Sequence, residues 1–171
     1  MSFANNQVFG DDITVTYGSA VYPLGTERLV LGAQTGVGDQ VWVFVYNSSG
    51  GSIAANTLVR HATTSANGTV SAATTGLNPS YLVGVVQGSA LPGVTTTSST
   101  GQVLSGPYGW VLKRGVGTVL TGAGYAQDQG LISSAATNGA ADSTATSTTA
   151  TFGYGLGAAA GGAAQVYLSI I

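Results

Sequence analysis

The sequence predicts an all-β fold, organised as a single compact β-barrel or β-sandwich. Short apolar or alternating segments recur about every 10 residues, clusters of turn formers separate them, and long helical periodicity is missing. The 171 residues fit one domain, and 44% of them are hydrophobic, which is enough to fill a core. We divide the chain into an N-terminal arm with the first strand (residues 1–17) and a β-domain (residues 18–171) with long Ser/Thr/Gly-rich loops.

The clearest strand covers residues 41–46, where β-branched and aromatic residues alternate. Six apolar residues can bury both faces of a strand but are too short for a stable helix. A second such segment covers residues 81–86, in which Gly84 permits a bulge or a close approach of another backbone. We expect both segments in one core, whose predicted members are Val41, Trp42, Val43, Phe44, Val45, Leu82, Val85, Tyr108, Trp110, Leu112, Val166, Leu168 and Ile170.

The N-terminal residues 1–12 are polar and irregular apart from Val8 and Phe9. Alone such a segment would fray, so we expect either an extended arm that lies on a neighbouring molecule or a disordered tail. The residues from Ile13 to Tyr17 alternate strictly between apolar side chains and threonine, which predicts a half-buried strand.

Further strands are expected at residues 27–31, from residue 53 to residue 59, and at residues 69–71. The last lies in a polar stretch, which is typical of a short edge strand. Residues 89–105 form a long Thr/Ser-rich segment, and a loop of this length is either functional or held by a partner.

In the C-terminal half, residues 108–114 predict a strand with Tyr108, Trp110 and Leu112 on one face. The segment Gly115-Val116-Gly117 predicts a tight link to residues 118–120, so that the two form a hairpin. Residues 133–151 are almost entirely Ala, Ser, Thr, Asn and Gly, which predicts a loop held by the domain's own β-surface or by a neighbouring chain. Residues 165–171 predict a closing core strand.

The low charge of the chain argues against one class of function, nucleic-acid binding. Only 6% of the residues are charged and the formal net charge is −2, so the clustered Lys and Arg that a nucleic-acid binder needs are missing. Such a chain suits a subunit of a large assembly, and equally a secreted β-domain of low charge. The first residues lack the pattern of a signal peptide and no apolar run reaches the ~20 residues of a membrane span, so we expect synthesis in a cytoplasm and no membrane partner.

The polar residues do not predict an enzyme, a cofactor or a metal site. There is no cysteine, and His61 is the only histidine, beside Arg60 at a predicted strand end, which favours a surface or loop role. Asp11 and Asp12 are neighbours, but neighbouring side chains in a strand point to opposite faces. The glycine-rich segments lack the lysine and the following helix of a phosphate-binding loop.

Aromatic residues offer one alternative. Trp42, Trp110 and tyrosines at 46, 81, 108, 125, 154 and 167 could together form a platform for stacking sugars. Most of them alternate with aliphatic residues inside predicted strands, which favours core packing instead.

The order of several segments resembles a family of tailed-bacteriophage capsid decoration (cement) proteins over residues 38–171. The sharpest is the Tyr-Gly-Trp-Val block, within Gly106-Pro107-Tyr108-Gly109-Trp110-Val111-Leu112-Lys113-Arg114-Gly115. The other segments that carry the resemblance are residues 41–46, 52–59, 83–88, 155–160 and the closing strand.

The resemblance implies a compact β-domain on the outer surface of an expanded phage head, usually as a homotrimer, that ties neighbouring major capsid protein subunits together. It also implies an extended N-terminal arm on the capsid, for which we select Val8, Phe9, Ile13 and Val15 as contact residues. The insertions at 89–105 and 133–151 depart from shorter members, which leaves their role open. The rival hypotheses are a carbohydrate-binding or adhesive module of a head fibre or tail, and a self-assembling shell subunit.

Overall fold

The computed structural model describes residues 13–32, 36–62, 68–101, 103–145 and 150–171. Within them, ten strands form one sheet in the order β1-β2-β4-β3-β5-β8-β12-β11-β9-β10, and β6 and β7 form a separate hairpin. The elements are β1 (Glu27–Val30), β2 (Gln40–Asn47), β3 (Leu58–His61), β4 (Thr69–Ala72), the 3-10 turn η1 (Pro79–Tyr81), β5 (Leu82–Val85), β6 (Thr96–Thr97), β7 (Val103–Ser105), β8 (Tyr108–Leu120), β9 (Gly130–Ser133), β10 (Ala141–Thr144), β11 (Gly153–Gly155) and β12 (Ala163–Ser169).

Five of these strands close into a barrel. Strand β2 pairs in parallel with β4 and antiparallel with β8, and β3 and β5 complete the ring between β4 and β8. β-Branched side chains of medium size suit the interior of so narrow a barrel. The all-β prediction is therefore confirmed, as a closed barrel with additional strands, and the cluster inside it contains Val43, Val45, Val59, Val70, Val83 and Val111, with Ile53, Val86 and Leu91.

A second cluster lies outside the barrel wall and continues beneath the part of the ten-stranded sheet formed by β8, β12, β11, β9 and β10, which we call the second sheet. On β2, Trp42 and Phe44 belong to it and alternate with the interior valines, so both faces of this strand are buried. The other predicted core residues that are buried in this cluster are Leu82, Val85, Trp110, Leu112, Val166, Leu168 and Ile170.

Two predicted core residues are only half-buried. Val41 lies near the end of β2 at a register shift against β8, so no neighbouring layer covers it fully. Tyr108 begins β8 and packs over Phe44 at the border of the cluster, with a ring-centroid distance of 6.4 Å.

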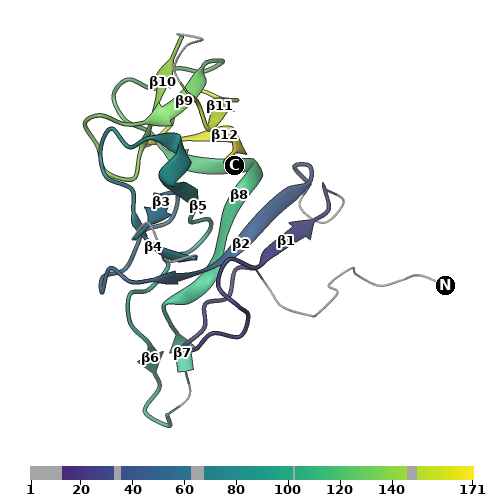
Figure 1. Cartoon of the computed structure of the whole chain (residues 1–171), viewed down its shortest axis with the longest axis vertical. Helices are drawn as coiled ribbons and strands as arrows, with labels where there is room; N and C mark the ends of the chain where they lie inside the picture. Colours follow the sequence, from purple (N-terminus) through teal and green to yellow (C-terminus); the bar gives the residue numbers. More distant parts are fainter. Residues whose placement is uncertain (1–12, 33–35, 63–67, 102, 146–149) are drawn as a thin grey trace, which may run out of the picture.

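The predicted hairpin at residues 108–120 is wrong, because β8 is one continuous strand of 13 residues. Its first half pairs with β2, and its second half, from Arg114 to Leu120, pairs with β12. Gly115 has φ +111 and bends the strand, and a Cβ there would lie 2.6 Å from the Asp39 carbonyl oxygen. The glycines thus redirect the strand instead of reversing it. In Figure 1, β8 runs from near the β6–β7 hairpin at the bottom to the β9–β12 strands at the top.

Two glutamine side chains form hydrogen bonds with backbone groups of β8 in the part of the strand that no longer pairs with β2. The Gln40 Nε2 donates to the Val116 carbonyl oxygen at 2.6 Å, and the Gln87 Nε2 donates to the Thr118 carbonyl oxygen at 2.7 Å. The Thr118 amide donates in return to the Gln87 Oε1 at 3.0 Å. Because a primary amide carries both a donor and an acceptor, it can replace a strand partner at this edge.

Three other segments differ from expectation. Residues 13–17 form no extended strand, and only Tyr17 makes an isolated bridge, to Tyr108. The β4 strand is not at an edge, because β2 and β3 lie on either side of it. The segment 133–151 contributes β10, which pairs with β9, so the described part of this segment is held by the domain's own sheet.

The close packing of β5 on β8 gives a stability test at Gly84. A Cβ at this position would lie 2.7 Å from the Leu112 carbonyl oxygen and 2.8 Å from Val111 Cγ2. We expect Gly84→Ala to lower the free energy of unfolding by about 1–3 kcal/mol, because the two strands must separate to admit the methyl group. Urea denaturation followed by circular dichroism measures this change.

The matched control is Gly51→Ala, where a Cβ would meet no atom within 4 Å. Its free energy of unfolding should stay within about 0.5 kcal/mol of wild type. Equal stabilities for the two variants would contradict the close approach of β5 and β8.

Candidate interaction surfaces

The described end of the N-terminal arm and the residues after it contact the barrel wall through aromatic rings. We call residues 13–22 the arm root. Tyr22 packs edge-on against Phe44 and tilted against Trp110, each at 5.4 Å between ring centroids. The Tyr17 amide donates to the Tyr108 carbonyl oxygen at 2.8 Å, and the Tyr108 amide donates back at 3.2 Å. The arm root is therefore part of the folded domain.

The four arm residues selected from the sequence have different surroundings. Ile13 is half-buried and packs against the second cluster, so it contributes to the domain's own core. Val15 is 43% exposed and, like Val21 at 50%, offers an apolar side chain to the outside. Val8 and Phe9 lie outside the described residues.

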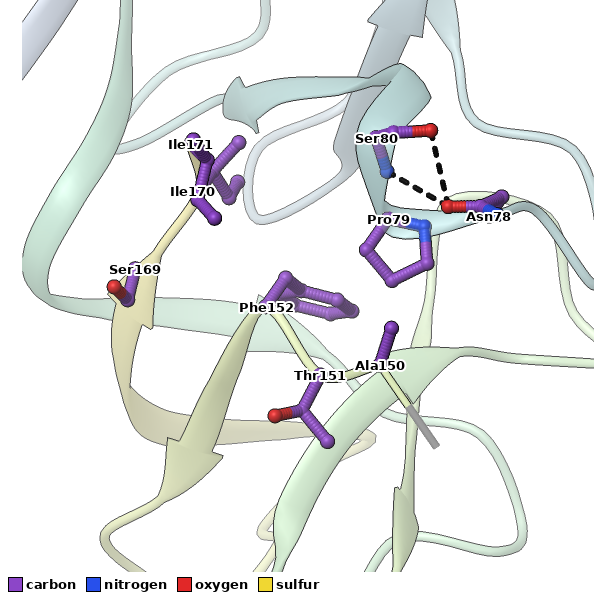
Figure 2. A pocket seen from close by; sticks show the side chains of 9 residues that line it. All are labelled: Asn78, Pro79, Ser80, Ala150, Thr151, Phe152, Ser169, Ile170 and Ile171. Atoms are coloured by element: carbon purple, nitrogen blue, oxygen red, sulfur yellow. Dashed lines mark hydrogen bonds between the residues drawn. The ribbon is translucent and has the colours of Figure 1, made fainter. Parts of the chain in front are cut away.

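A hollow, which we call the C-terminal pocket, lies between η1, residues 150–152 and the end of β12, with a volume of about 310 Å³. Figure 2 shows the Phe152 ring in its wall, with Pro79 and Ala150 to one side and Ile170 to the other. Its polar rim consists of Asn78, Ser80, Thr151 and Ser169, and none of the described lining residues has a titratable side chain. The pocket can therefore receive an apolar group but offers it no acid or base.

The η1 side of the pocket is fixed by a cap. The Asn78 Oδ1 accepts hydrogen bonds from the Ser80 amide and the Ser80 Oγ, each at 3.0 Å. No local sequence pattern predicts this pocket, although Asn78-Pro79 is a turn signal. The pocket depends on residues distant in the sequence, which only the fold brings together.

A basic groove adjoins the C-terminal pocket. It has a volume of about 280 Å³, and Ser169, Ile170 and Ile171 line both hollows. Three charged residues, Glu27, Lys113 and Arg114, also line the groove, which gives it one excess positive charge, and the Lys113 Nζ forms an ion pair with the Glu27 Oε1 at 2.7 Å.

A small cavity of about 90 Å³ adjoins the basic groove, with which it shares Glu27, Lys113 and Ile171, and the half-buried His61 also lines it. His61 ends β3, as the sequence suggested for a strand-end position. No three His, Asp or Glu side chains of the described residues are grouped so that they could hold a metal ion.

Tyr125 lies beneath β11 and β12 in surroundings that affect its hydroxyl group. Burial, and to a smaller extent the nearby Asp128 carboxylate, raises the pKa of Tyr125 above that of an ordinary tyrosine. Its hydroxyl donates to the Gly157 carbonyl oxygen at 2.8 Å, so it supports the second sheet. Across the described residues, no helix is both long enough and apolar enough to span a membrane.

One aromatic pair stands on the outer face of the second sheet. Tyr154 on β11 and Tyr167 on β12 are direct cross-strand neighbours, and their rings stack at 5.3 Å between centroids with an angle of 21°. Tyr154 is 48% exposed, whereas Trp42 and Trp110 are buried. Of the proposed sugar platform, the structure therefore places this pair outside and both tryptophans inside.

Comparisons of this chain with known proteins found a similar solved structure but no matching family. No family model matches the chain, and no curated protein matches it. Among solved structures, it is similar to one described as the head fiber gp8.5 N base in bacteriophage phi29. The identity is 17%, the TM-score is 0.48, and the match covers 76% of this chain and 94% of that chain.

Proposed function

We propose that this protein is a non-enzymatic structural protein of a phage virion that decorates the outer surface of an expanded capsid and bridges major capsid protein subunits. The observation that carries the proposal is the arm root, where Val15 and Val21 are exposed on a segment that the aromatic rings of Tyr17 and Tyr22 hold against the barrel. A rigid base of this kind lets an N-terminal arm transmit binding energy to the whole domain.

Two further observations support this function. The resemblance of residues 38–171 to decoration proteins rests on the Tyr108 to Gly115 block, which forms the first half of β8. The surface charge is low, so apolar and hydrogen-bonded contacts, repeated over a shell, would provide the attachment. In this role the protein is made in the host cytoplasm and acts as a homotrimer on the outside of the virion.

The mechanism is linkage between binding and the state of the shell. A protein that binds the expanded lattice and not the unexpanded one stabilises the expanded form by RT ln(1 + [L]/Kd) per site. Here [L] is the concentration of free protein and Kd is its dissociation constant for the lattice. Many weak contacts per shell then add to a large resistance against pressure and heat.

We expect the purified protein to co-sediment with expanded, undecorated heads of its own phage, with saturable occupancy at a fixed ratio to the major capsid protein. Unexpanded proheads should bind little, because their subunits are arranged differently. Quantitative gel densitometry of the pellets gives both occupancies. Absence of binding to either particle, by protein shown to be folded by circular dichroism, would overturn the proposed function.

The arm is tested by Phe9→Ala. Truncating a central aromatic contact typically costs 2 kcal/mol or more, so we expect at least a tenfold weaker affinity for expanded heads, with an unchanged free energy of unfolding. The control is Tyr154→Ala, which removes an exposed ring from β11, beside the end of β8 opposite to the arm root. Wild-type occupancy in the Phe9 variant would exclude the arm as the main contact.

A second candidate function is a carbohydrate-binding or adhesive module of a head fibre or tail, which the exposed Tyr154–Tyr167 pair favours. Under this alternative, wild type is retained on a glycan array and Tyr154→Ala loses retention by about tenfold, since truncating a central aromatic contact costs more than about 1 kcal/mol and 1.4 kcal/mol is a factor of ten in affinity. Tyr81→Ala is the matched control, because Tyr81 is 47% exposed and lies on η1. Equal retention of both variants would exclude the tyrosine pair as a glycan site.

A further inference from the structure

We propose that the C-terminal pocket and the basic groove together bind an extended segment of the capsid protein that carries a medium-sized apolar side chain followed closely by a carboxylate. This inference rests on the proposed function and adds a second contact, separate from the arm. It assigns a partner chemistry to two hollows that share Ser169, Ile170 and Ile171.

The C-terminal pocket fits an apolar side chain. Phe152 and Ile170, both buried, contribute apolar surface to its wall, and Pro79 and Ala150 lie to one side of the Phe152 ring. Its volume of about 310 Å³ lies at the lower end of the range of ligand pockets, roughly 300–1,000 Å³, which suits one side chain with its adjoining backbone. The rim of Asn78, Ser80, Thr151 and Ser169 supplies neutral donors and acceptors for that backbone.

The basic groove fits a carboxylate. Arg114 on β8 is the cross-strand neighbour of Ser169 on β12, so its side chain leaves the sheet on the same face and about 5 Å from the pocket rim. Lys113 is already neutralised in part by Glu27, whereas Arg114 is exposed and has no ion-pair partner among the described residues. A guanidinium binds a carboxylate through two parallel hydrogen bonds, which favours an acidic partner at this position.

A register shift between β2 and β8 produces this arrangement. Val41 pairs with Arg114 and Trp42 with Leu112, which leaves Lys113 as an additional residue on β8. A bulge of this kind re-aims side chains at the end of a pairing. Both basic side chains therefore line the groove, where the regular alternation of a strand would place them on opposite faces.

The position of the second contact suits bridging. Tyr108, which anchors the arm root, and Arg114 lie six residues apart on β8, which corresponds to roughly 20 Å. Two contacts at this separation on a rigid strand can engage two different subunits of a lattice, or two segments of one subunit.

Two variants test the two hollows separately. Ala150→Phe fills the C-terminal pocket from an exposed position, and Ala136→Phe adds the same ring at an exposed loop position outside it. Arg114→Gln removes the unpaired cation, and Gln127→Glu changes the net charge by the same amount on an exposed residue away from the groove. All four proteins should show wild-type circular dichroism, because each substitution lies on the surface.

The direct probe is the peptide acetyl-Gly-Leu-Gly-Asp-Gly-amide, titrated into isotope-labelled protein while amide chemical shifts are recorded. We expect saturable shifts at Thr151, Phe152, Ser169 and Ile170, at least threefold weaker binding when Asp is replaced by Asn, and loss of the shifts when Leu is replaced by Ala. Ala150→Phe should abolish binding and Arg114→Gln should weaken it at least threefold, with both controls unchanged. Equal shifts with all three peptides, or shifts confined to other residues, would overturn the proposal.

Expanded heads separate this inference from the proposed function. If wild type binds heads and Ala150→Phe and Arg114→Gln bind as well as their controls, the inference is overturned and the decoration function stands. If wild type does not bind heads, the decoration function fails, and the peptide titration still decides whether the two hollows accept an apolar and acidic segment. Reduced occupancy of both variants, with wild-type occupancy of both controls, supports the two proposals together.

Discussion

The pairing of β2 with β8 is the constraint on which the rest of the structure depends. Without it, β2 would end an open sheet and the interior valines would face water. With it, the five strands close into a barrel, and the alternate residues of β2 point into two different clusters. Burial of both faces explains why this segment is apolar at every position from Val41 to Tyr46, which a strand with one solvated face would not require.

The same pairing must end at Arg114, because β8 continues into a second sheet. Gly115 allows the strand to bend because it has no side chain, and the side chains of two glutamines, instead of another strand, form hydrogen bonds with its free edge. A buried edge without these amides would leave carbonyl groups unpaired, which costs about as much as a lost hydrogen bond each. The bend also places the basic residues of β8 beside the end of β12, so the geometry of the fold creates the groove.

The predictability of each element follows from where its determinants lie. The apolar runs at residues 41–46 and 81–86 predict buried strands from their own residues alone, and both form strands. The segment Gly115-Val116-Gly117 fits a hairpin link and a bend equally well, and only the distant partners Gln40 and Gln87 decide between them. Residues 13–17 alternate as a strand does, yet the edge they meet offers only the bridge at Tyr108.

Candidate sites were harder to predict than strands for the same reason. The C-terminal pocket joins residues near positions 79, 151 and 170, and no local pattern announces a hollow formed by three separate segments. Tyr154 shows a second obstacle, because Gly153 and Gly155 on either side give a glycine-flanked ring the same pattern whether it faces a core or water. Whether a side chain on a strand is exposed depends on whether another layer of the structure covers that face of the strand, and β11 is covered on one face only.

The low charge of this protein limits the kinds of contact by which it can attach to a partner. With few ionic groups, long-range attraction contributes little, so specificity must come from shape and from the rare charges that are present. The Arg114 guanidinium has no ion-pair partner among the described residues, whereas Lys113 in the same groove is paired with Glu27. Under the proposed binding mode, Arg114 is therefore the cation that discriminates between otherwise similar segments. Such contacts are individually weak. Under the proposed function, their repetition across a shell, with each domain held at two points along β8, would convert modest affinities into stable decoration.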